Sequence, residues 1–265
     1  MALHRTPALV IGRRALGEGD RLVEFYTRDF GKIRGVARSA RRPRSRFGSA
    51  LEPFTVGELL FFESGRSDLV RVDHFDVVRP FARLREELER LGRGAWAVEC
   101  VARLSADRDP QPALYRLLIR ALGALDASPR PEWTAVCFAA RAIDLLGHRP
   151  QLDRCAGCGR SYPFGGAAAL DVAAGGLVCG RCPPGPDALP MSASAVGALK
   201  RLRVIRWEDG LRLSLAPDLE AEVISIVEGV IVRLAGQIPR SSRFIAQMRR
   251  SLSRVAEPAP SGRRR

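Results

Sequence analysis

The sequence has no run of about 18 uncharged apolar residues, the length that a membrane-spanning helix needs. Its most apolar stretch, residues 223–235, is interrupted by Glu228 and Arg233. The first twelve residues hold only a short apolar run with no small-residue cleavage pattern after it, so the sequence predicts no secretory signal peptide. These absences exclude a transmembrane protein, and we expect a cytoplasmic one.

Sequence signatures of catalysis are also missing. The three histidines, His4, His74 and His148, belong to no His-x-Glu or His-Glu-x-x-His motif. The sequence contains no phosphate-binding loop of the Gly-x-x-x-x-Gly-Lys type, and its glycines between residues 12 and 19 do not follow the dinucleotide-binding order. We therefore predict that the protein is not an enzyme.

Lysine is scarce, yet the chain is strongly basic. Only Lys32 and Lys200 are lysines among 43 basic residues, and the formal net charge is +14. Residues 1–80 carry 15 basic and 10 acidic side chains, residues 81–239 carry 20 and 18, and residues 240–265 carry 8 and 1. A basic surface attracts polyanions, so the two ends of the chain predict contact with nucleic acid.

The first 80 residues contain five short segments with strand character. These segments, which read as strands broken by turns, are residues 8–14, 21–27, 32–38, 55–63 and 68–77. Glycine- and aspartate-rich turns separate most of these segments, whereas the residues near 39–53 must form a long loop. Five strands with one long basic loop predict an OB-fold β-barrel.

After Pro80 the apolar residues follow the period of helices. The first helical stretch runs from Leu84 to Leu104. Further helices are predicted over residues 112–126, 131–146, 192–204 and 217–235. Residues 151–189 have no helical period and are rich in glycine, proline and cysteine. The predicted fold is a multidomain α+β one, with a barrel over 1–80, a helical domain from 81–150 and 190–255, an insertion over 151–189, and a disordered basic tail over 256–265.

The six cysteines include two Cys-x-x-Cys pairs separated by 20 residues: Cys155 with Cys158, and Cys179 with Cys182. This spacing predicts one structural zinc ion, because four thiolates complete a tetrahedral shell with no open position. Ordinary core cysteines and a thioredoxin-like redox pair are the alternatives. The two remaining cysteines, in apolar helical stretches, are expected to be small buried side chains.

The most concentrated basic segment of the predicted barrel lies over residues 32–46. Its seven cations, with no acidic residue among them, are Lys32, Arg34, Arg38, Arg41, Arg42, Arg44 and Arg46. In an extended strand the first three share one face, and the following loop can wrap a phosphate backbone. This pattern predicts a nucleic-acid-binding track, with a merely solvated loop as the alternative.

Four aromatic residues lie near this track in sequence: Phe25, Tyr26, Phe30 and Phe47. Aromatic rings can stack on unpaired bases, but each of these rings can equally belong to the barrel core. Because Phe47 falls in the loop, it is expected to be the least core-like of the four and is included in the nucleic-acid-binding set.

Short segments along the chain carry a family resemblance. They include Thr6-Pro-Ala-Leu-Val-Ile-Gly, Phe30-Gly-Lys-Ile-Arg-Gly-Val, Ser45-Arg-Phe-Gly-Ser-Ala-Leu-Glu-Pro-Phe, Leu146-Gly-His-Arg-Pro-Gln-Leu-Asp-Arg-Cys and Arg240-Ser-Ser-Arg-Phe-Ile. Over nearly its whole length the chain resembles the family of the bacterial recombination mediator RecO. The resemblance implies an OB-fold, a helical domain with an inserted zinc finger, and work in the RecF pathway of DNA repair.

Members of that family bind single- and double-stranded DNA, anneal complementary strands, join RecR and the single-strand-binding protein SSB, and help RecA onto coated DNA. The resemblance thus implies a nucleoid-associated mediator that acts by binding. Two other classes stay open on the residues alone, an RNA-binding OB-fold accessory protein and a zinc-containing nucleic-acid enzyme.

The acidic, apolar C-terminal tail of SSB is expected to dock after Pro80, in an apolar pocket rimmed by arginine. The sequence offers two such pockets. They are Leu117, Leu118 and Leu122 beside Arg116 and Arg120, and Ile224 and Val227 near Arg203 and Arg206.

Overall fold

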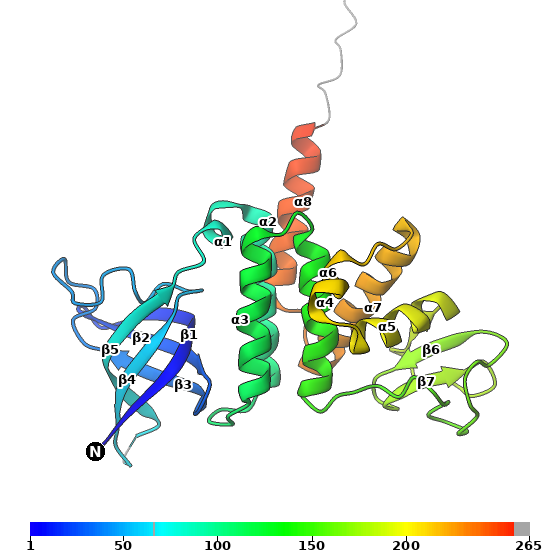
Figure 1. Cartoon of the computed structure of the whole chain (residues 1–265), viewed down its shortest axis with the longest axis horizontal. Coiled ribbons are helices and arrows are strands. Elements are labelled where there is room, and N and C mark those ends of the chain that lie inside the picture. The colour runs from blue at the N-terminus through cyan, green and yellow to red at the C-terminus, as the bar shows by residue number, and fades with distance from the viewer. Residues whose placement is uncertain (66, 257–265) are drawn as a thin grey trace, which may run out of the picture.

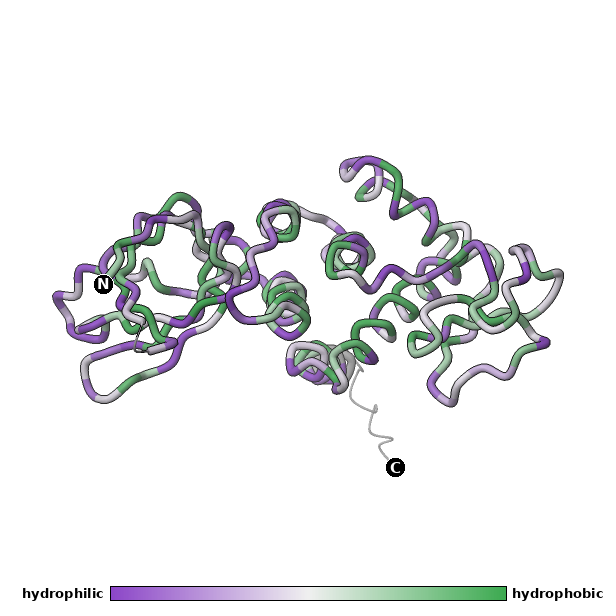
Figure 2. Tube along the Cα trace, turned by 90° about the horizontal axis from the view of Figure 1, so that it is seen from below, coloured by the Kyte–Doolittle hydropathy of each residue, from purple (hydrophilic) through white to green (hydrophobic). Residues whose placement is uncertain are grey.

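Three parts follow one another along the longest axis of the molecule: a β-barrel, a bundle of helices, and a small β-sheet at the far end (Figures 1 and 2). The computed structural model describes residues 1–65 and 67–256. Within them, no helix has both the length and the apolar character that crossing a bilayer requires. The predicted disordered tail, apart from Ala256 at its start, lies outside the described residues.

The barrel consists of β1 (Ala2–Leu16), β2 (Asp20–Thr27), β3 (Gly31–Ala37), β4 (Val56–Glu63) and β5 (Leu69–Arg79). The sheet closes in the order β1-β2-β3-β5-β4, with β3 and β5 parallel and the other neighbours antiparallel. This five-stranded closed sheet confirms the predicted OB-type barrel.

Strand β1 is longer than predicted from the sequence because it pairs with two strands, β2 and β4. Its residues 2–9 pair with β4 and its residues 8–16 pair with β2, with an irregularity between Val10 and Gly12. A bulge of this kind bends a strand and lets one strand close a barrel. The predicted strand, residues 8–14, covers only part of the half that pairs with β2.

The helical part contains α1 (Arg83–Glu86), α2 (Leu88–Leu104), α3 (Pro112–Ala127), α4 (Pro131–Leu145), α5 (Ala193–Val204), α6 (Trp207–Arg212), α7 (Pro217–Ala235) and α8 (Arg240–Ala256). Proline occupies the first turn of α3, α4 and α7, and the Ser192 hydroxyl accepts the Ala195 amide at the start of α5. These four helices confirm the predicted ones closely. The short α6 and the C-terminal α8 were not predicted.

The insertion between α4 and α5 holds a three-stranded sheet in the order β7-β6-β8. Its strands are β6 (Ala168–Asp171), β7 (Gly176–Cys179) and β8 (Leu189–Met191). Leu170, Leu177 and Met191 belong to the apolar cluster of the bundle, so one side of the sheet is fixed to the helices. The cysteines lie away from that contact, in a cluster of their own.

The barrel and the bundle share apolar core. Leu9, Tyr26 and Phe54 of the barrel pack into the cluster that contains most of the helical side chains, and the rings of Tyr26 and Tyr115 lie 6.3 Å apart. The barrel is therefore joined to the helices by buried surface and not only by the connecting chain.

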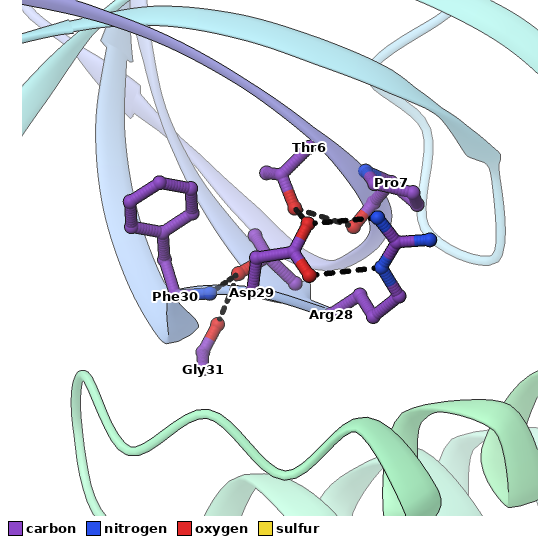
Figure 3. Close-up of polar contacts among 7 residues, drawn as sticks. Thr6, Pro7, Arg28, Asp29, Phe30 and Gly31 are labelled. Atoms are coloured by element: carbon purple, nitrogen blue, oxygen red, sulfur yellow. Dashed lines mark hydrogen bonds and ion pairs between the residues drawn. The ribbon is translucent and has the colours of Figure 1, made fainter.

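The turn between β2 and β3 is fixed by polar contacts (Figure 3). The Asp29 carboxylate accepts hydrogen bonds from the Thr6 hydroxyl and the Arg28 guanidinium, both at 2.9 Å. The bond from Arg28 lowers the pKa of Asp29 from its ordinary value. Two residues after Asp29, Gly31 has φ of +63°, and a Cβ there would meet the Asp109 backbone at 2.3 Å, so only glycine allows this approach between barrel and helices.

Candidate nucleic-acid interface and metal centre

The long loop from β3 to β4 presents arginines on a rigid support. Arg38, Arg41, Arg42, Arg44 and Arg46 are all exposed. Within the same loop, Phe47 is 4% exposed and Leu51 is 0% exposed, and both side chains belong to the barrel core. The loop is thus held by its apolar residues while its cations face solvent.

The start of the loop is bound to the β1–β2 turn. The Ser39 amide donates to the Asp20 carboxylate at 2.7 Å, and the Arg41 amide donates to the Gly19 carbonyl at 3.0 Å. The Arg41 guanidinium also donates to the Gly17 carbonyl at 2.8 Å. These bonds restrict the loop, so its arginines are partly preorganised for an anionic ligand.

Lys32 differs from the other cations of the predicted track. Its ammonium donates to the Ala102 carbonyl at 2.6 Å and the Ser105 carbonyl at 3.1 Å, and it lies 3.1 Å from the Asp107 carboxylate. A cation at the carbonyl end of a helix is electrostatically favourable. Its side chain is only 19% exposed, so Lys32 joins the barrel to α2 and has little capacity left for phosphate.

Phe47 was expected to be the least core-like aromatic residue, and that expectation is wrong. Phe47 and also Phe25 and Tyr26 are buried, while Phe30 packs against Phe61 with ring centroids 5.2 Å apart. The loop needs an apolar side chain to bind to the barrel, and Phe47 supplies it. Three of these four rings are therefore buried, and Phe30 is half-buried.

The outer face of the barrel brings a further cation and ring beside the track. Strand pairing places Arg71 of β5 opposite Val36 of β3 and opposite Phe62 of β4. The Arg71 guanidinium lies 4.4 Å from the centre of the half-buried Phe62 ring. Alternation in β4 and β5 marks both residues as outward, but only the register shows that Arg71 lies opposite Val36, between Arg34 and Arg38 in the sequence.

The four cysteines of the two Cys-x-x-Cys pairs come together. The Sγ atoms of Cys155, Cys158, Cys179 and Cys182 all lie within 4.8 Å of one another. The separations of Cys155 from Cys182 and of Cys158 from Cys179 are both 3.8 Å. Four sulfurs placed about 2.3 Å from one centre lie about 3.8 Å apart, so the cluster fits a tetrahedral metal ion.

The backbone around this cluster favours the thiolate of Cys155, whereas the neighbouring Cys158 sulfur raises the pKa of Cys182 to about 12. Burial opposes ionisation of Cys155, but N–H groups of Cys179, Cys158 and Gly157 point to its sulfur and lower its pKa to about 6. A Cβ at Gly157 would lie 3.1 Å from the Cys182 sulfur, so glycine leaves room for the approach of the two pairs. Within the described residues, no other group of three or more metal-ligating side chains was found.

Two histidines lie beside carboxylates, and the two cysteines outside the cluster are buried. His4 lies 3.2 Å from Glu63, and His74 lies 2.8 Å from Asp76. Cys100 and Cys137 are buried in the bundle, as expected for small apolar side chains.

The two pockets that the sequence offered for a peptide tail are closed. Leu118 and Leu122 are 0% exposed and Val227 is 2% exposed. The cavity beside Val227 measures only about 30 Å³. One arginine of each pocket is also paired, because Arg120 contacts Glu208 and Arg203 lies 2.8 Å from Asp144.

A larger groove of about 650 Å³ lies between the barrel and α2. Ile11, Phe54, Leu91, Ala95 and Val98 give it an apolar floor. Three arginines and three glutamates also line it, so charge does not select an acidic peptide there: Arg85, Arg103, Arg240, Glu24, Glu52 and Glu99.

Comparison with known proteins covers nearly the whole chain. The family model described as "Recombination protein O N terminal" matches residues 1–81, and "Recombination protein O C terminal" matches residues 85–243. A protein of Anaeromyxobacter sp. (strain K) named "DNA repair protein RecO" is 41% identical over 234 residues, which are 88% of this chain and 91% of that one. Proteins of the same name from Myxococcus xanthus and Symbiobacterium thermophilum are 35% and 33% identical over 91% and 94% of this chain, and 96% and 99% of theirs.

Proposed function

The chain belongs to the RecO family of DNA repair proteins, and on that basis we propose that it is a recombination mediator that binds single- and double-stranded DNA and anneals complementary strands. In this proposal it acts at the nucleoid, with RecR, and helps RecA to load on SSB-coated DNA. The observation that carries the proposal is the exposed arginine loop, fixed on an OB-type barrel by Phe47 and Leu51.

The arginines neutralise phosphates. Arg34, Arg38, Arg41, Arg42, Arg44 and Arg46 form the proposed track, to which the outer face adds Arg71. Lys32 and Phe47 are left out because one is bound to helix carbonyls and the other is buried. Annealing is opposed by repulsion between two phosphate backbones, and bound guanidinium groups reduce it while releasing counterions.

Phe62 is the ring best placed to contact an unpaired base. It is half-buried, lies on the outer face of β4 and is covered on one side by Arg71. Stacking on an aromatic ring or a guanidinium tolerates any base, which suits a protein that must handle all sequences. The proposed mechanism uses binding energy alone and needs no covalent step.

We assign one structural zinc ion to the cysteine cluster. Thiolate ligands of this number and spacing are typical of zinc, and four of them leave no position for a substrate or a reactive water. The metal would stabilise the outer part of the insertion. The tail of SSB is assigned to the helical part of the protein, at a place other than the two closed pockets.

The test is annealing of complementary strands coated with SSB, combined with salt titration of single-strand binding. Replacing Arg38, Arg41, Arg42 and Arg44 with alanine removes four proposed contacts. Each phosphate contact on a single strand contributes about 0.7 to the log-log salt slope, so the slope should fall by about 3 and annealing should slow.

A control variant loses the same charge elsewhere. Four arginines on the helical part are exposed and form no ion pair with the described residues: Arg83, Arg116, Arg201 and Arg212. Their replacement with alanine should leave the slope near that of the wild type. Equal slopes for both variants would contradict the assigned track. Tighter binding to RNA than to DNA of the same sequence, or metal-dependent turnover of either, would instead favour one of the two other classes.

A further inference from the structure

The C-terminal helix α8 is basic along its whole length. Its 17 residues contain five arginines and no acidic residue. Arg240, Arg243 and Arg250 are exposed, and no ion pair to their side chains is found within residues 1–65 and 67–256. Spacings of three and seven residues place these cations on one face of the helix.

Like charges at such spacings repel one another, so a helix that carries them gains stability when an anion binds. The helix is also about 25 Å long at about 1.5 Å per residue, long enough to follow several phosphates of one strand.

One carboxylate fixes the start of this helix to the bundle. Glu99 of α2 accepts the backbone N–H groups of Arg240 and Ser241 at 2.9 Å and the Ser241 hydroxyl at 2.7 Å. The Arg103 guanidinium donates to the same carboxylate at 2.7 Å. These bonds satisfy the first amides of α8, so its direction is determined by α2.

Close packing continues the attachment over the next turn. Ile245 is 5% exposed and lies against Gly92, where a Cβ would approach it to 2.8 Å. Beyond that contact, Figure 1 shows the outer half of α8 standing clear of the other helices. The apolar side is therefore used at the base of the helix, and the side with Arg243 remains open to solvent.

We propose that α8 is a second phosphate-binding element, which holds one nucleic-acid strand while the arginine loop of the barrel holds another. The inference rests on the proposed annealing function, and it adds a second strand-binding site to the one on the barrel. The match to the C-terminal family model ends at Arg243, so Arg250 lies beyond it.

A nucleic-acid strand fits these observations better than a membrane does. An amphipathic helix lies on a membrane through its apolar face, but Ile245 packs on α2 and makes that face unavailable at the base. A strand needs only cations and an open approach, which α8 provides.

The test is a strand-bridging assay with the full-length protein. A single strand fixed to beads is loaded with protein, and capture of a second, labelled and non-complementary strand is then measured. In Arg243→Ala/Arg250→Ala, capture of the second strand should fall about tenfold and its log-log salt slope by about 1.4, at about 0.7 for each contact. Loading on the first strand should stay within about twofold of the wild type, because the barrel track is intact.

The control is Arg201→Ala/Arg212→Ala, which removes the same charge from exposed positions on α5 and α6. This control should capture the second strand as the wild type does. Equal capture by the α8 variant and the wild type would overturn the inference. If that variant also no longer binds SSB, then α8 contacts an acidic protein and not a nucleic-acid strand. A wild-type protein that neither bridges nor anneals would instead overturn the proposed function itself.

Discussion

The barrel and the cysteine insertion are both built from short strands, yet they are stabilised in different ways. The barrel closes on itself around a cluster of fourteen buried residues. The cysteine end of the insertion has an open three-stranded sheet and a cluster of only three buried residues, two of which are Cys155 and Cys179. A segment with so little apolar core needs a cross-link, whereas a closed barrel does not.

The difference in stabilisation also distinguishes nucleic-acid binding by the barrel from metal binding by the insertion. In the barrel, the same loop supplies core side chains and exposed cations, so binding of nucleic acid depends on packing. In the insertion, the glycines and backbone amides serve the cysteines, and its outer part should depend on the metal alone. The following variants test this division, beginning with the largest expected effect.

Cys155→Ser should remove the metal and unfold the outer part of the insertion. Structural zinc contributes an apparent free energy of about 10–16 kcal/mol in small zinc domains, far more than the local core can supply. Metal analysis should find less than one ion per chain, and amide hydrogen exchange should rise over residues 153–182 but not in β1–β5. Cys137→Ser, at a buried cysteine outside the cluster, should keep the metal. Exchange that rises equally in the barrel would show that the two parts do not fold separately.

Phe47→Ala should destabilise the barrel by about 3–5 kcal/mol and leave the insertion unchanged, because it empties a buried site. Affinity for single-stranded DNA should also fall, since the arginine loop loses its anchor. Phe47→Leu keeps an apolar side chain and should retain most of that affinity. If leucine and alanine weakened DNA binding equally while the leucine variant stayed folded, the ring would act by stacking and not by packing. Urea unfolding and DNA titration measure both effects.

Lys32→Met should cost about 1.5–3 kcal/mol of stability, the usual contribution of hydrogen bonds from a charged group. The salt dependence of DNA binding should not change, because the ammonium is bound to α2 carbonyls. Arg38→Met should behave in the opposite way, with stability unchanged and a smaller salt slope. A loss of slope in the lysine variant would return Lys32 to the nucleic-acid track.

The smallest expected effect concerns Glu99, whose hydrogen bonds attach the start of α8 to α2. This attachment depends mainly on neither an apolar core nor a metal. Burial alone would raise the pKa of Glu99, but hydrogen bonds from Ser241, Arg240 and Arg103 lower it from 4.5 to about 2. A lowered pKa means that the attachment of α8 is fully present above pH 4.5 and is lost as pH falls toward 2. Amide exchange in the first turns of α8 should therefore rise over this range, and in Glu99→Gln it should already be raised at pH 7. An acid-insensitive α8 would show that Ile245 alone holds it.

The helices and the metal ligands were accessible to sequence reasoning because their signals are local. Proline at the first turn of α3, α4 and α7, and Ser192 before α5, mark where helices begin without reference to the rest of the chain. The cysteine spacing works in the same way, since each pair must form a tight turn and two pairs complete one tetrahedron. Five short strands broken by turns, with one long basic loop, were likewise enough to predict a barrel.

The candidate nucleic-acid surface was only partly accessible, since it depends on contacts between distant residues. Charge marked residues 32–46 as a basic segment, but tertiary structure decided that Lys32 faces the carbonyl end of α2 and that Phe47 enters the core. The same holds for Phe62 and Arg71, which become neighbours only through the register of β4 and β5. The sequence by itself determined the barrel strands, the four helices that begin at proline or Ser192, and the spacing of the metal ligands, because short-range spacing specifies them. Which cations remain free for a ligand was decided by packing between segments 70 and more residues apart, which no local pattern records.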